Sequence, residues 1–170
     1  MKDDSVNRST YHMRRKDREI KSRAEIIDIV KGQKIATIAM CKDNSPYLIT
    51  ADYGFDEQEN CFYIHCAKRG KKIDFLRANP RVWGCIVEDL GYVQGECDHY
   101  YHSVHFEGEA ELITDLERKR KALELIIDFL EDDPEKGKKE FITKTKFLNT
   151  MIVRINVSRF TGKCNVPKKK

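Results

Sequence analysis

Six short apolar segments, most of them separated by tight turns, limit the fold of this chain more than any other feature. Residues 34–40 (KIATIAM) and 47–53 flank the turn-forming sequence at 42–46, and this order predicts a β-hairpin. Residues 103–113 alternate apolar and polar side chains, which is typical of an antiparallel strand with one buried face. Three more strands are expected at 61–66, 81–87 and 151–157.

Helical periodicity occurs between these strands. An amphipathic helix is predicted from Asp17 or Ser22 to Gly32, and Ser22 has a glutamate three residues later, which is the spacing of a capping box. The remaining segments are a short helix that ends at Asn79-Pro80, a long helix over 116–130 and a charged loop around 132–139. Sheets of six strands protect their edges by closing. The sequence therefore predicts an α+β, mainly β, domain built as a small antiparallel β-barrel with flanking helices.

Length and composition restrict the class of protein further. The 170 residues fit one globular domain. No apolar run is long enough for a transmembrane helix and the N-terminus shows no signal peptide, so we expect a cytoplasmic protein without a membrane partner. The six cysteines form no CxxC pair and are expected to be reduced. His99 and His105 face one way on a strand and His102 the other, so no metal site is expected there.

The positive charge of the chain is concentrated at its ends. Residues 1–23 have a balance of +4 and the three terminal lysines add +3, so the rest must sum to −3 against the total of +4. A nucleic-acid-binding domain normally carries its basic patch on the folded body. The charge distribution therefore speaks against nucleic acid as a partner.

One internal segment departs from this pattern. Residues 68–81 contain six Lys/Arg and only one acid, Asp74. In this segment a strand ends at His65, and a basic turn leads through Gly70 into the start of a helix. Free N–H groups and partial positive charge at a helix N-terminus favour an anion, and glycine allows the backbone to approach a phosphate. The segment is either an anion site or a solvated lysine-rich turn.

Several short pieces, in this order and spacing, resemble one known family over residues 13–163. They are Met13-Arg14-Arg15-Lys16-Asp17-Arg18-Glu19-Ile20, Pro46-Tyr47-Leu48-Ile49, Tyr53-Gly54-Phe55, Tyr63-Ile64-His65, Ala67, Gly70-Lys71-Lys72, Asn79-Pro80, Tyr101, Ser103-Val104, Gly108-Glu109-Ala110, Val153-Arg154-Ile155 and Thr161-Gly162-Lys163. The chain resembles the flavin-binding split barrels related to pyridoxamine 5′-phosphate oxidase. Within them it most resembles the nitroimidazole-resistance (NimA-like) branch.

The resemblance implies an antiparallel six-stranded split β-barrel over residues 15–165, with an N-terminal arm at 1–14 and a basic tail at 166–170. It also implies a homodimer with a flavin nucleotide at the subunit interface. FMN is the expected cofactor, while the basic pair Lys68-Arg69 leaves room for the second phosphate of FAD, so both stay open.

The resemblance also assigns site residues. The phosphate is expected on Gly70-Lys71-Lys72 and the isoalloxazine ring against residues 47–51, with His65 as the candidate catalytic residue beside it. The expected cofactor-binding residues are Tyr47, Leu48, Ile49, Thr50, Ala51, His65, Cys66, Ala67, Lys68, Gly70, Lys71, Lys72, Ser103, Thr161 and Lys163. Near the partner's flavin, Phe160 is expected to supply apolar area and Lys163 a hydrogen-bond donor. Trp83 is expected in the core or at an interface. The three arginines Arg14, Arg15 and Arg18 either cap the cofactor or anchor the arm.

The function that the resemblance suggests is a flavin-dependent reductase that acts on a small-molecule electron acceptor. The alternative is a non-catalytic flavin- or haem-binding module for storage or sensing, in which His65 is an axial ligand. The chain has no GxGxxG motif, so a nicotinamide donor would bind without a Rossmann unit. The physiological substrate and the electron donor are not encoded in any of these patterns.

Overall fold

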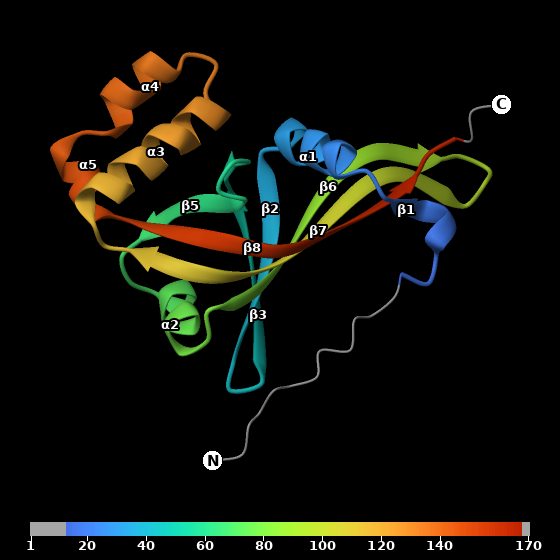
Figure 1. Ribbon diagram of the computed structural model, residues 1–170, viewed down its shortest axis with the longest axis horizontal. Coiled ribbons are helices and arrows are strands. Elements are labelled where there is room, and N and C mark those ends of the chain that lie inside the picture. The colour runs from blue at the N-terminus through green and yellow to red at the C-terminus, as the bar shows by residue number, and fades with distance from the viewer. Residues whose placement is uncertain (1–12, 168–170) are drawn as a thin grey trace.

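A single antiparallel sheet of eight strands is the frame of the protein in a computed structural model that describes residues 13–167. Its hydrogen-bonded order is β3-β2-β6-β7-β8-β5-β4, with β1 added to β8 (Figure 1). The strands are β1 (Glu19–Ile20), β2 (Ile35–Lys42), β3 (Ser45–Asp52), β4 (Gly54–Asp56), β5 (Cys61–Ala67), β6 (Arg81–Val93), β7 (Asp98–Ile113) and β8 (Thr150–Asn165). The two ends of this order, β3 and β4, are separated in the chain only by Tyr53, so the sheet curls back on itself as a split barrel.

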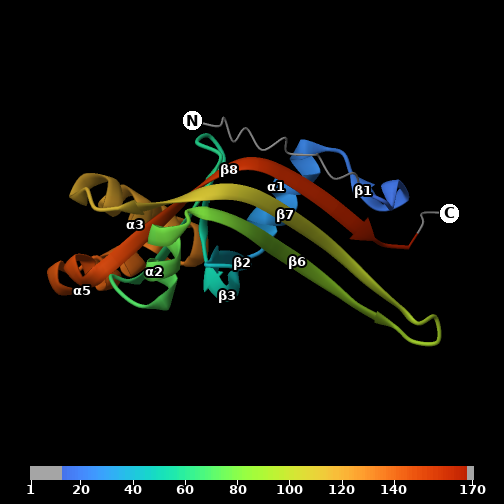
Figure 2. The same ribbon diagram turned by 90° about the horizontal axis from the view of Figure 1, so that it is seen from below.

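All six strands that the sequence predicts are present, and the α+β split-barrel class is confirmed. Two of the eight strands, β1 and β4, are only two and three residues long, which is too short to give a periodic signal. Strands β6, β7 and β8 are longer than predicted. Figure 2 shows them curving side by side, with β6 and β7 extending farthest as an arm that ends in the β6–β7 turn.

The helices lie at several places around this sheet. They are the short 3₁₀ helix η1 (Lys16–Arg18) and the α-helices α1 (Arg23–Gly32), α2 (Lys71–Ala78), α3 (Leu116–Leu130), α4 (Pro134–Phe141) and α5 (Lys144–Asn149). Helix α1 lies against β7 and β8, while α3, α4 and α5 gather at the end where β8 begins (Figure 1). Ser22 caps α1 as predicted, because its side chain accepts a hydrogen bond from the Glu25 amide at 3.3 Å.

The charged loop that the sequence predicts at 132–139 is instead part of a helix, α4. Asp133 caps this helix by accepting a hydrogen bond from the Lys136 amide at 3.1 Å, and Pro134 occupies its first turn. Lys138 bridges Asp128 of α3 and Glu135. These capping signals were available in the sequence, but the charge of the segment obscured them.

The barrel interior is an aromatic and aliphatic core. The rings of Phe62 and Phe106 lie 4.4 Å apart, and the Tyr53 hydroxyl donates a 2.6 Å hydrogen bond to the Val30 carbonyl of α1. Residue 84 must be glycine, since a Cβ there would lie 1.9 Å from the Phe106 ring. The core therefore fixes both the curvature of β6 and the position of α1.

The expected N-terminal arm and basic tail lie mainly outside the described residues. Arg18 extends toward Asp98 of β7 at 3.9 Å, and Arg15 pairs with Asp17 at 2.6 Å. The first contact ties η1 to β7, while the second is local to η1. No helix in residues 13–167 is long and apolar enough to cross a bilayer.

Candidate functional site

The turn before α2 has the features of the predicted anion site. Gly70 precedes the helix with φ of 128°, a conformation that side-chain-bearing residues rarely adopt. No side chain of the described residues caps the first amides of α2. Lys68, Arg69 and Lys71 are exposed around this turn and Lys72 is half-buried. The turn thus combines free N–H donors with positive charge at a helix N-terminus.

Strand β3 lies beside this turn. The Lys71 ammonium sits 4.4 Å from the centroid of the Tyr47 ring, which in turn lies 5.1 Å from the ring of Phe75 in α2. Along β3, Tyr47, Ile49 and Ala51 pack against the core, whereas Leu48 and Thr50 are exposed. Within the hydrogen-bonded order, β3 is a terminal strand that pairs only with β2. Its outer backbone groups are therefore available to a planar ligand.

A cavity of about 820 Å³ opens next to the turn. His65, Cys66, Ala67 and Lys72 line one wall, and residues of α3 and α5 line the other. Burial raises the pKa of the Cys66 thiol, while the nearby Lys72 charge acts in the opposite direction. Four of the predicted cofactor residues thus face one cavity.

One residue beside this region was not singled out from the sequence. Lys119 of α3 is buried, donates to the Phe147 carbonyl and lies 4.7 Å from the Phe147 ring centroid. Burial lowers its pKa, and the Lys68 charge adds to that effect. Its position three residues after Leu116 and four before Leu123 places it on the apolar face of the helix, and this spacing could have identified it.

Three other predicted cofactor residues, Ser103, Thr161 and Lys163, lie on β7 and β8 and do not line this cavity. Ser103 and Lys163 are paired across β7 and β8, and Ser103 Oγ donates to the Lys163 carbonyl at 3.4 Å. At the other end of β8, Thr150 pairs with Ala67 beside the basic turn. Thirteen residues of strand, at about 3.3 Å each, separate Lys163 from Thr150 along β8, or roughly 40 Å along a curved path. Thr161 and Lys163 therefore lie far along the strand from the turn of their own chain.

Phe160 is half-buried and packs against its own barrel, and its predicted contact with the partner's flavin stays a prediction. Its ring lies 6.1 Å from Phe62 and 6.4 Å from Phe106, among the core aromatics of its own barrel. The alternation of β8 explains this, because side chains 159, 161 and 163 point to the opposite face.

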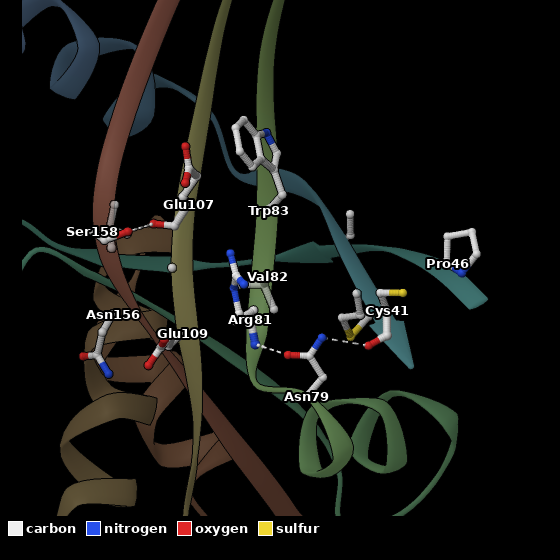
Figure 3. A pocket seen from close by; sticks show the side chains of 14 residues that line it. Cys41, Pro46, Asn79, Arg81, Val82, Trp83, Glu107, Glu109, Asn156 and Ser158 are labelled. Carbon is white, nitrogen blue, oxygen red and sulfur yellow. Dashed lines mark hydrogen bonds between the residues drawn. The ribbon is translucent and has the colours of Figure 1, made fainter. Parts of the chain in front are cut away.

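A groove of about 630 Å³ crosses the outer face of the sheet, and Figure 3 shows the side chains around it. Asn79 shapes its lower end: it donates to the Cys41 carbonyl at 3.1 Å and accepts from the Arg81 amide at 3.1 Å. Trp83 lies at the other end and is 47% exposed, so it belongs to the surface and not to the core. The Trp83 indole N–H donates to His105 Nδ1 at 3.1 Å.

The histidines of β7 are each engaged by a different neighbour. His99 pairs with Asp89 at 2.7 Å and His102 with Glu88 at 2.6 Å. His105 lies between Trp83 and Cys85, with 3.7 Å from its Nε2 to the cysteine sulfur. Burial, and then the Lys163 charge, lowers the pKa of His105. All six cysteines are free thiols.

Comparisons with known proteins identify relatives of this chain. The family model for pyridoxamine 5′-phosphate oxidase matches residues 22–164. An uncharacterised protein of Rhizobium meliloti (strain 1021) is 33% identical over 64 residues, a stretch that covers 37% of this chain and 40% of that protein. The match thus spans well under half the length of that relative.

Solved structures share the fold. A protein of Bacteroides thetaiotaomicron named for 5-nitroimidazole antibiotic resistance has a TM-score of 0.71 and 25% identity over 86% of each chain. An FAD-binding protein of Mesorhizobium loti gives a TM-score of 0.66 and 23% identity, covering 88% of this chain and 98% of that one. An FAD- and haem-binding protein of Mycobacterium smegmatis gives 0.71 and 17%, covering 90% and 77%. With the split barrel in place and the family model spanning nearly all of it, the chain belongs to the pyridoxamine 5′-phosphate oxidase family.

Proposed function

We propose that this protein binds a flavin nucleotide and that the turn before α2 holds its phosphate. The observation that carries the proposal is the combination of features at Gly70. This residue has a positive φ, the helix amides that follow it are uncapped, and the two residues before it and the two after it are all basic. Family membership supports it, as do the FAD-binding proteins that share the fold. A singly phosphorylated FMN needs only this turn, and Lys68-Arg69 adds positive charge for the second phosphate of FAD.

The isoalloxazine ring is proposed to lie against β3. The free edge of this strand offers backbone donors and acceptors, and the exposed Leu48 side chain offers apolar contact. When bound, the flavin supplies the electron or hydride chemistry. The chain's own contribution is to bind the phosphate, to orient the ring and to place the exposed His65 imidazole on the cavity wall, where it can exchange a proton.

A homodimer is proposed because three of the residues expected to bind the cofactor lie far from the basic turn of their own chain. Ser103, Thr161 and Lys163 are far along β7–β8 from the turn, so only Thr161 and Lys163 of the partner subunit could approach it. The outer face of the sheet is suited to such an interface. Leu48 and Trp83 both lie opposite Ala39, one on each side of β2, and they are 63% and 47% exposed. Val87, on the same face of β6, is 51% exposed. Stable interfaces bury more than about 1,200 Å² in total.

The interface can be tested by reversing the character of one side chain. Trp83→Asp is expected to convert the dimer to a monomer in light scattering and to lower flavin content. Leu116→Asp is the matched control, since Leu116 is 56% exposed but lies on α3, away from this face. A Trp83→Asp protein that stays dimeric, or a wild type that is monomeric at micromolar concentration, would overturn the proposed interface.

The proposed activity is reduction of a small-molecule acceptor, and a 5-nitroimidazole is the first to test, given the Bacteroides protein that shares the fold. The protein is loaded with FMN, reduced with dithionite without oxygen, and mixed with the nitroimidazole. We expect its flavin to be reoxidised faster than free reduced FMN. A rate no faster than that of free FMN would mean that the protein holds the flavin without catalysing this reaction.

The haem-binding alternative has one observation in its favour. His65 is exposed on the wall of a large cavity and its side chain makes no hydrogen bond among the described residues, so its imidazole is available as an axial ligand. The absorption spectrum of the purified protein distinguishes the two, since haem gives a Soret band and flavin does not.

A further inference from the structure

The cavity beside the basic turn has more apolar wall than phosphate binding requires. Its volume of about 820 Å³ falls within the range of small-molecule sites. One wall is the inner face of α3 and the segment that joins α4 to α5. Its apolar residues are Leu123, Ile126, Ile127, Leu130, Phe141 and Ile142. Phe141 lines the cavity and is 45% exposed, so a ligand in the cavity would cover part of its side chain.

The polar residues of this cavity include both basic and acidic side chains. At one end, Thr150 of β8 pairs with Ala67 of β5. Lys146 belongs to α5, one helical turn before Thr150 in the chain. The Lys146 ammonium donates to the Glu140 carbonyl at 3.2 Å and lies 5.0 Å from the Phe141 ring centroid. Lys72 lies at the same end, where its charge favours the thiolate form of Cys66. This end of the cavity is therefore basic.

Two acids, Asp52 and Glu131, also line the cavity, where β3 and α3 finish. The Tyr53 amide donates to the Lys34 carbonyl at 3.3 Å, and the Lys34 ammonium donates to the Leu130 carbonyl at 2.5 Å. These two contacts bring the chain at Asp52 and Glu131 together, with the Lys34 ammonium beside them. An anion is accordingly favoured beside Lys72 and Lys146 and disfavoured beside Asp52 and Glu131.

From this arrangement we infer that the cavity binds a small organic acid with a mainly apolar, aromatic or aliphatic body. Its acid group contacts Lys146, since Lys72 is assigned to the flavin phosphate, and its body packs on α3 and Phe141. His65 and Cys66 line the same space, so the bound acid lies next to the proposed phosphate turn. The inference deepens the proposed function, on which it rests, by naming the class of molecule that meets the flavin.

The test uses naphthoate as the probe and naphthylmethanol as its uncharged counterpart, titrated by calorimetry into the full-length protein. Wild type is expected to bind naphthoate about tenfold more tightly than the alcohol, as one charge-assisted contact would give. Lys146→Glu should abolish this preference, while Lys139→Glu, an exposed lysine of α4 outside the cavity, should retain it. Phe141→Ala should weaken both probes at least about threefold by removing buried apolar area.

A second control separates loss of the site from loss of the fold. Leu148 is 41% exposed, similar to Phe141, but does not line the cavity, so Leu148→Ala should bind both probes as wild type does. The inference is overturned if wild type binds neither probe. It is also overturned if Phe141→Ala and Lys146→Glu bind like wild type, or if Leu148→Ala loses as much affinity as Phe141→Ala.

Titration of FMN into the same proteins distinguishes this inference from the proposed function. FMN binding without naphthoate binding overturns the cavity assignment and leaves the flavin proposal standing. Naphthoate binding without binding of FMN or FAD refutes the flavin proposal, and with it the acid's role as a partner of the flavin. Binding of both, with Lys146→Glu affecting only naphthoate, is the result that we expect.

Discussion

Replacing Lys71 and Lys72 together by alanine should weaken FMN binding far more than riboflavin binding, because only FMN carries the phosphate. Lys72 is half-buried, so its contact with a phosphate falls in the range of about 1.5–3 kcal/mol for a partly desolvated charged group. Lys71 is exposed and already lies over the Tyr47 ring, so its contribution is only about 0.5–1 kcal/mol. Together they amount to about 2–4 kcal/mol, which corresponds to a loss in FMN affinity between about 30-fold and about 700-fold.

The assay is quenching of flavin fluorescence at low salt, with both ligands titrated into both proteins. Riboflavin should lose less than about threefold, since it lacks the phosphate. Lys136→Ala with Lys139→Ala is the matched control: it removes the same charge from exposed positions on α4 and should leave both affinities unchanged. Equal losses of FMN and riboflavin in the Lys71/Lys72 variant would refute the assignment of this turn to the phosphate.

Three further variants test the fold that positions the site. Gly84→Ala places a Cβ 1.9 Å from the Phe106 ring and should destabilise the protein by about 1–3 kcal/mol or more in urea denaturation, whereas Gly32→Ala, with nothing within 4 Å of its Cβ, should not destabilise it. Tyr53→Phe leaves the buried Val30 carbonyl without its 2.6 Å partner and should cost about 1–3 kcal/mol; an unchanged denaturation midpoint would show that this hydrogen bond does not hold α1. The pKa of folded His105 is lowered from 6.5, so the unfolded chain takes up the proton first and stability falls as pH drops below about 6.5. His105→Gln should flatten that part of the pH profile, and a profile identical to wild type would contradict the lowered pKa.

The strands of the barrel could be predicted because period-two alternation and turn residues are local signals. All six predicted strands are present, and the Ser22 cap and the basic turn at Gly70 are where the sequence indicates them. The extension of β6 and β7 could not be predicted in the same way. Beyond Val87 both faces of this arm carry polar or exposed side chains, so the apolar alternation that marks a half-buried strand disappears.

The composition of the candidate site was only partly accessible from the sequence. Cys66 and Lys72 are near one another in the chain, and a local motif brings them to one cavity. The opposite wall comes from α3 and α5, more than 50 residues further on, and only tertiary packing places it there. The packing of Phe160 against Phe62 is a tertiary contact of the same kind, because the two residues are almost 100 positions apart in the chain.

The central claim, flavin binding at the basic turn, is tested most directly by identifying what the purified protein carries. The protein is denatured, and the released ligand is analysed by absorption and mass spectrometry; ligand-free protein is then titrated with FMN and FAD. The account predicts a flavin nucleotide in the released fraction or saturable binding of one flavin nucleotide per chain, with weaker binding of riboflavin. A Soret band with no flavin, or the absence of saturable FMN and FAD binding, would contradict it.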